Sequence, residues 1–163
     1  MSRRRQLAGA VVAIAAISLS SALVSSGTAG PLVKKQRIAI EERVAHGARS
    51  GTFTLIPLTP GPLKADSGTF TFSVTTEPTI IRNGQSITTY KGVDELKGKR
   101  GTLRIPNVTA ATAAGGGYGA GTATWSIRSG TGAYAGLKGS GRGAVVGTPE
   151  ADLTRYEGYV STS

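Results

Sequence analysis

Short runs in which apolar and polar residues alternate recur from residue 37 to residue 161, and this pattern constrains the fold more than any other feature. The clearest run is GTFTFSVTT, in which Phe70, Phe72 and Val74 share one face and threonines occupy most of the other. Strict alternation is typical of a β-sheet with one buried face. The sequence therefore predicts an all-β protein.

The runs predict about eight strands, spaced as in a β-sandwich or a β-barrel. Asn83-Gly84 is a strong signal for a tight turn between two of them. VDELKG (93–98) can form one helical turn, and residues 109–120 are either a mobile loop or a strand weakened by glycine. The predicted strands are 37–44, 51–57, 68–76, 79–81 with 86–93, 99–106, 121–128, 141–147 and 154–161.

The first thirty residues have the pattern of an export signal. MSRRRQ is positively charged, LAGAVVAIAAISL is apolar, and Gly27-Thr28-Ala29 fits the small-residue rule for cleavage. We expect a signal-peptide helix in 1–29, a basic linker in 30–36 and the barrel domain in 37–163. This pattern predicts a secreted or cell-envelope protein, by a Sec or twin-arginine route, with an uncleaved anchor as the alternative.

Cysteine is absent and the charge is strongly positive, with 19 lysines and arginines against 9 acids. Without a disulfide framework, stability must come from an apolar core and backbone pairing. The basic charge favours attraction to anionic surfaces such as the cell envelope. Nucleic-acid binding requires aromatic platforms among the basic residues, and the aromatic residues here follow the apolar face instead, which argues against that partner.

SGTGAYAGLKGSGRG (129–143) is rich in glycine and begins like a dinucleotide-binding loop. Such a loop requires a helix directly behind it, and glycines at every second or third position cannot hold one. No cofactor is therefore predicted, and the glycines are interpreted as backbone devices at turns and bends. These structural glycines are Gly130, Gly132, Gly136, Gly139 and Gly141.

The segment GTATWSIRSGTGAYAGLKGSGRGAVV resembles the strand–GTG–aromatic–strand–GxG signature of the allene oxide cyclase and dirigent-like β-barrel superfamily, which includes small exported bacterial relatives. The resemblance covers residues 120–147, and elsewhere only the strand count and the closing YEGYV agree. It implies an eight-stranded antiparallel barrel whose central cavity can hold a small apolar ligand. No motif identifies positions that would match the family's catalytic residues.

The alternation also predicts which side chains face the interior. One shared face is expected for Phe53, Leu55, Phe70, Phe72, Val74, Leu103, Ile105, Trp125, Ile127 and Val160. The candidate ligand-binding residues are Phe70, Phe72, Leu103, Trp125, Ile127, Tyr156 and Glu157.

Acids in the strands are the candidates for chemistry. Adjacent residues of a strand face opposite ways, so one of Glu41 and Glu42 points inward if the segment pairs, and Glu157 can face a cavity as well. An inward carboxyl group would have a raised pKa and can act as an acid or bind a ligand. The rarity of buried unpaired acids favours the alternative, a solvated outer face.

No catalytic residue and no metal site is predicted. His46 is the only histidine and lies in the loop-like VAHGARSG, away from other ligand types. No G-x-S-x-G occurs that would present a serine nucleophile.

The sequence thus favours an exported, non-enzymatic barrel that binds a small apolar molecule or an envelope component. Two alternatives stay open: a cyclase- or isomerase-like enzyme that acts on a lipid or polyphenol, and a structural surface protein with a filled barrel. A cavity argues against the filled barrel, and a carboxyl group with polar partners inside that cavity favours the enzyme.

Overall fold

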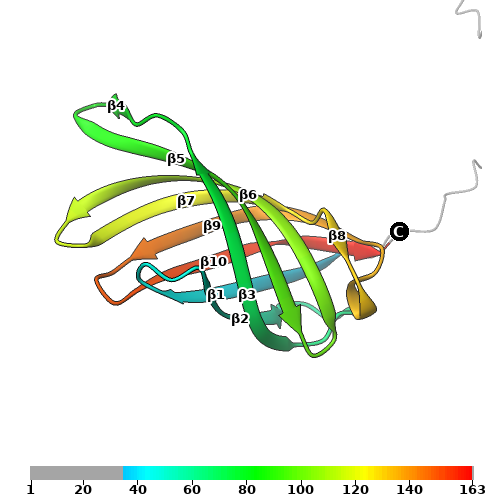
Figure 1. Ribbon diagram of the computed structural model, residues 1–163. Helices are drawn as coiled ribbons and strands as arrows, with labels where there is room; N and C mark the ends of the chain where they lie inside the picture. Colours follow the sequence, from blue (N-terminus) through cyan, green and yellow to red (C-terminus); the bar gives the residue numbers. More distant parts are fainter. Residues whose placement is uncertain (1–34, 163) are drawn as a thin grey trace, which may run out of the picture. The chain divides into compact units, whose positions relative to one another are not determined.

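The computed structural model describes residues 35–162, which form an all-β domain (Figure 1). The predicted signal-peptide helix and most of the predicted linker lie outside the described residues. Within the described part of the chain, the one helical segment is the 3-10 turn η1 (Gly132–Tyr134). The strands are β1 (Gln36–Ala45), β2 (Ser50–Pro57), β3 (Asp66–Thr76), β4 (Ile80–Arg82), β5 (Gln85–Gly98), β6 (Gly101–Gly115), β7 (Tyr118–Ser126), β8 (Ser129–Gly130), β9 (Leu137–Gly147) and β10 (Ala151–Thr162).

Eight of these strands close into an antiparallel barrel. Hydrogen bonding runs in the order β1, β2, β3, β5, β6, β7, β9 and β10, and β10 pairs back with β1. The short strand β4 pairs with β5 alone, and β8 pairs with the beginning of β6. The predicted fold class, a single antiparallel barrel of about eight strands, is confirmed.

Two neighbouring strands, β5 and β6, extend well beyond their predicted limits. VDELKG continues β5 instead of forming a helical turn, because Asp94 and Leu96 face the interior while Glu95 and Lys97 are exposed. Residues 109–120 form the end of β6 and the start of β7, so the strand interpretation of this glycine-rich segment is correct. Strands β6 and β7 thus form a long hairpin that projects at one end of the barrel (Figure 1).

The predicted interior face is confirmed over most of its length. Phe53, Leu55, Phe70, Leu103, Ile105, Trp125, Ile127 and Val160 all belong to one buried cluster. Phe72 is partly buried against this cluster, and Val74 is 40% exposed nearer the end of the barrel that carries the β6–β7 hairpin.

The opposite end of the barrel is sealed in part by the connection between β2 and β3. The Gln36 amide donates to the backbone carbonyls of Thr59 and Leu63, each at 3.0 Å, and accepts from the Leu63 N–H at 2.9 Å. Gln36 and Leu63 are both buried. Three hydrogen bonds to one side chain thus hold the connection against the start of β1.

Asp66 completes this closed end. Its carboxylate accepts the Tyr134 hydroxyl at 2.6 Å and the backbone N–H groups of Ser67, Lys99 and Arg100 at 2.8–3.1 Å. Burial raises the pKa of Asp66, but the hydrogen bond from Tyr134 and those from the backbone outweigh this effect, so the pKa lies below its usual value. Asp66 therefore ties η1 to the turn between β5 and β6.

The glycines fall into two groups. Gly132 has a φ of +60°, and a Cβ there would collide with the carbonyl oxygen of Arg100, so its predicted place at a turn is correct. Gly136 also has positive φ, and Gly130 lies in β8 just before η1. Gly139 and Gly141, predicted to serve at turns and bends, lie inside the long strand β9 and not at a turn.

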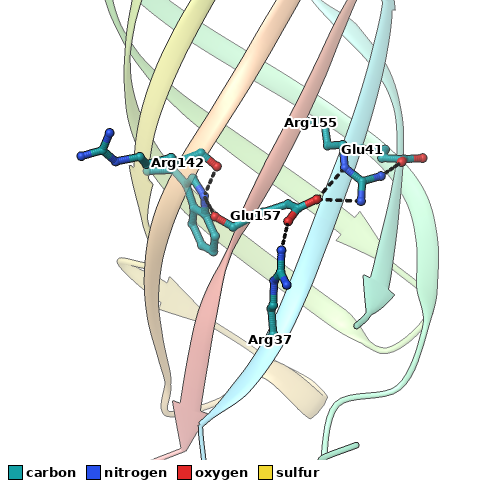
Figure 2. Close-up of polar contacts among 6 residues, drawn as sticks. Arg37, Glu41, Arg142, Arg155 and Glu157 are labelled. Carbon is teal, nitrogen blue, oxygen red and sulfur yellow. Dashed lines mark hydrogen bonds and ion pairs between the residues drawn. The ribbon is translucent and has the colours of Figure 1, made fainter. Parts of the chain in front are cut away.

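The glycines inside β9 leave space for the backbone of the neighbouring strand β10. A Cβ on Gly141 would collide with the backbone carbonyl of Glu157 on β10. Trp125 pairs with Gly141 in the ladder, and its indole N–H donates to the carbonyls of Arg142 and Glu157 at 3.3 Å (Figure 2). Glycine thus lets β9 and β10 approach each other closely beside the large indole ring.

Candidate functional site

A cavity of about 540 Å³ occupies the half of the barrel nearer the β6–β7 hairpin. Its wall is mostly apolar, with small side chains from β6 and β7 and a set of aromatic rings. The aromatic lining residues are Phe70, Phe72, Tyr90, Tyr118 and Tyr156. Because the other half is filled by the buried cluster, the cavity is closed at depth and reached from one end.

Polar side chains gather on the lining where three strands meet. The carboxylate Oδ2 of Asp94 on β5 accepts the amide of Asn107 on β6 at 2.7 Å and the hydroxyl of Tyr156 on β10 at 3.1 Å. Asp94 is only 5% exposed and Tyr156 only 3%. Both hydrogen bonds stabilise the ionised carboxylate and orient it within an otherwise apolar space.

Glu42 on β1 is the second carboxyl group of the lining. It continues the inward face of Ile40 and Val44, and its side chain is 6% exposed. Its Oε1 has no hydrogen-bond partner among the described residues. Glu41, its neighbour, points outward and pairs with Arg155, so the alternation of a strand separates two identical side chains.

The two carboxyl groups influence each other's protonation. Burial raises the pKa of Glu42 well above its usual value, and the nearby charge of Asp94 raises it further. Burial also raises the pKa of Asp94, to about 6, although the hydrogen bonds from Tyr156 and Asn107 act in the opposite direction. Protonation of the two groups is therefore linked, because the charge on Asp94 favours the protonated form of Glu42.

The expectation that Glu157 faces the cavity is corrected by the structure. Tyr156 points inward, so Glu157 points outward, between Arg37 and Arg155 (Figure 2). Its Oε2 accepts from Arg37 at 2.6 Å and its Oε1 from Arg155 at 2.8 Å. The hydrogen bonds from Arg155 and Arg37 hold the pKa of Glu157 below its usual value. Glu157 belongs to a surface ion-pair cluster that also includes Glu41.

The other candidate residues divide between two levels of the barrel. Phe70, Phe72 and Tyr156 line the cavity, while Leu103, Trp125 and Ile127 belong to the buried cluster without lining it. The rings of Trp125 and Tyr156 are 6.1 Å apart, so these two side chains mark the boundary between the levels. A role in contacting a ligand stays a prediction for the three residues that line the cavity.

Sequence reasoning does not single out Asp94 or Asn107. A signal for Asp94 exists in its spacing from Leu96, which places both on one face once VDELKG is taken as a strand. Asn107 offers no comparable signal, because it follows Pro106 at the predicted end of a strand. Their meeting depends on the pairing of β5 with β6, in which Asn107 lies opposite Gly92.

Residues 35–162 contain no metal-ligating cluster and no membrane-spanning helix. No three His, Cys, Asp or Glu side chains of this range gather closely enough to hold a metal ion. The same residues include no helix long and apolar enough to span a bilayer. His46 is exposed in the turn between β1 and β2.

Comparison of the sequence with protein-family models finds no match. Comparison with curated proteins likewise finds no significant match. Inference about function therefore rests on the geometry and chemistry of the cavity.

Proposed function

We propose that this protein binds one small, mostly apolar molecule in the barrel cavity. The observation that carries this proposal is a space of about 540 Å³ with an apolar, ring-bearing wall and two convergent carboxyl groups. Small-molecule sites have volumes of roughly 300–1,000 Å³ and combine such walls with a few placed polar groups. A barrel with a purely structural role would fill this half with side chains, as the opposite half is filled.

The place of action that we propose is outside the cell or in its envelope. The charged, apolar and small-residue order of residues 1–29 supports export, and the net charge of +10 supports contact with anionic envelope surfaces. Membership of the allene oxide cyclase and dirigent-like superfamily is likewise a proposal. It is supported by the glycine segment at 129–143 and is consistent with the eight-stranded barrel.

A cyclase- or isomerase-like activity is the second candidate, and Glu42 favours it. A protonated carboxyl group without a protein partner can donate its proton to an oxygen atom of a bound substrate. Asp94, ionised and held by Asn107 and Tyr156, can stabilise positive charge that develops nearby. Two carboxyl groups with separated pKa values are the usual arrangement for acid and base roles.

The binding proposal is tested with the neutral fluorescent probe N-phenyl-1-naphthylamine, whose emission increases in apolar sites. Ala111→Trp places a large ring on the cavity wall and is expected to abolish the increase. The control is Ala110→Trp on the neighbouring, exposed position of the same strand, which should bind as the wild type does. Equal probe binding by both variants would refute the cavity as the binding site.

The enzymatic candidate is tested by the fate of the bound material. Mass spectrometry identifies molecules that co-purify with the wild type and with Glu42→Gln. A molecule that the wild type converts to an isomer, and that Glu42→Gln binds unchanged, supports catalysis. The same molecule unchanged in both proteins supports binding alone.

A further inference from the structure

The ionisable lining of the cavity is acidic, although the protein as a whole is strongly basic. Glu42, Asp94 and Asp152 line it, and none of the described lining residues is a lysine, arginine or histidine. The sequence as a whole has 19 basic residues against 9 acids. A recess of one charge sign with low-dielectric walls focuses its potential and attracts ligands of the opposite sign.

The acids of the cavity have no cationic partner among the described residues. The surface acids Glu41 and Glu157 have arginine partners, whereas Glu42 has none and its Oε1 lacks any hydrogen-bond partner among the described residues. Buried carboxyl groups are otherwise paired or fully hydrogen-bonded. The missing partner of Glu42 can therefore come from a molecule in the cavity.

Asp94 offers a second acceptor to the same molecule. Both of its hydrogen bonds, from Asn107 and Tyr156, go to Oδ2, and no residue of the described range donates to Oδ1. Both carboxyl groups line the same cavity, so one small ligand can present donor groups to each of them.

The aromatic rings of the wall suit a cation with an apolar body. Phe72, Tyr90 and Tyr118 line the cavity together with the deeper rings of Phe70 and Tyr156. An ammonium group is attracted to the face of an aromatic ring, and an alkyl or aryl body packs against the same surfaces. Recognition of charge and of apolar shape is thus combined in one wall.

We propose that the ligand of this cavity is a small organic ammonium ion with an apolar body, whose charged group contacts Glu42 and Asp94. This inference rests on the proposed binding function and names the chemical class of the ligand. The same carboxyl groups exclude organic anions. A neutral molecule of the same shape binds, but without the contribution of the charge.

Proton release accompanies the binding of such an ion. In the empty cavity burial favours the protonated form of Glu42, and an ammonium group beside it favours the ionised form. The other titratable groups of the lining supply no positive charge that would replace the ligand; they are Tyr90, Asp94, Tyr118, Asp152 and Tyr156. Binding is therefore expected to weaken as the pH falls and Glu42 and Asp94 become harder to ionise.

The test compares three probes of matched shape by titration calorimetry at neutral pH: 1-naphthylmethylamine, 1-naphthalenemethanol and 1-naphthoic acid. We expect the amine to bind at least about tenfold more tightly than the alcohol, and the acid more weakly than the alcohol. Titrations in two buffers with different ionisation enthalpies should detect proton release for the amine alone.

Three variants assign the preference to the cavity. Glu42→Gln combined with Asp94→Asn removes both charges at nearly constant shape, and should bring the affinities for amine and alcohol within about threefold of each other. Glu41→Gln removes the neighbouring outward acid and should keep the full preference. Tryptophan emission from the buried Trp125 verifies that each variant is folded.

The outcomes separate the two proposals. An alcohol that binds as tightly as the amine, or an acid that binds most tightly, overturns the ammonium inference and leaves the binding function intact. A preference that persists without Glu42 and Asp94 also overturns it. Failure of all three probes and of N-phenyl-1-naphthylamine to bind overturns the proposed function itself.

Discussion

The stability of this barrel is expected to fall as the pH rises from about 4 through about 6, which is the opposite of the usual behaviour of acids paired on a surface. The fall results from the ionisation of Asp94 and Glu42, whose pKa values are both raised in the folded protein. A raised pKa means that the folded state binds protons more tightly than the unfolded state. The resulting stability is fully present below the unfolded pKa and is lost as the pH rises through the folded pKa.

The size of the expected loss of stability follows from the pKa of Asp94. Its pKa rises from 3.8 to about 6 on folding. At about 1.4 kcal/mol for each pKa unit, the free energy of unfolding should fall by about 3 kcal/mol across this window. Glu42, whose pKa is also raised, contributes in the same direction. A loss of this size is a large part of the stability of a small domain.

Two other acids act in the opposite direction, but in a different window. The pKa values of Asp66 and Glu157 are lowered, so their stabilisation is present above the unfolded pKa and is lost as the pH falls through the folded pKa. Both losses begin only as the pH falls below the usual pKa values of these groups, 3.8 for Asp66 and 4.5 for Glu157. The range above these values is therefore governed by the two cavity acids.

The assay is urea unfolding, followed by the emission of Trp125, at intervals of pH. Asp94→Asn should remove most of the decline near pH 6 and should be more stable than the wild type at pH 8. The matched control is Glu95→Gln, on the exposed side of the same strand, where the full decline should persist. A flat profile in the wild type, or stability that rises with pH, would refute the protonation states assigned here.

Three further outcomes are expected. Gly132→Ala should destabilise the protein by at least about 1 kcal/mol, measured by thermal unfolding, because φ is +60° and the carbonyl of Arg100 leaves no space for a Cβ; an unchanged melting temperature would contradict this. Tyr134→Phe should lower the free energy of unfolding by about 1–3 kcal/mol, since the Asp66 carboxylate loses a 2.6 Å hydrogen bond, and a neutral effect in urea titration would argue against the closed-end network. Trp125, only 3% exposed, should emit at a blue-shifted wavelength, resist quenching by iodide and shift to the red on unfolding; free access of iodide would mean that the sheet is assigned inside out.

The fold class was predictable from the alternation of apolar and polar residues along single strands. Alternation with a period of two is a property of each strand alone, and it correctly placed Phe53, Phe70 and Trp125 on the interior face. The turn at Gly132 was equally predictable, because the glycines behind it are too closely spaced for an α-helix. The lengths of β5 and β6 could not be predicted from the sequence. The added parts of both strands have weak local strand signals and became strands only by pairing with each other.

The candidate site depended on tertiary structure. Alternation places Glu42 on the same face as Ile40 and Val44, and the pairing of β1 with β2 and β10 makes this face the interior of the barrel. The same register turns Glu157 outward, although Tyr156 beside it faces the cavity.

An all-β chain, the apolar face of its strands and the glycine turn at residue 132 could each be predicted, because each follows from the conformational preferences of a few adjacent residues. Only the closed barrel decided that Glu42, Asp94, Asn107 and Tyr156, which lie on four different strands, line one cavity. The physical reason is that barrel closure and strand register are set by the sum of long-range backbone pairing. No short segment contains that information.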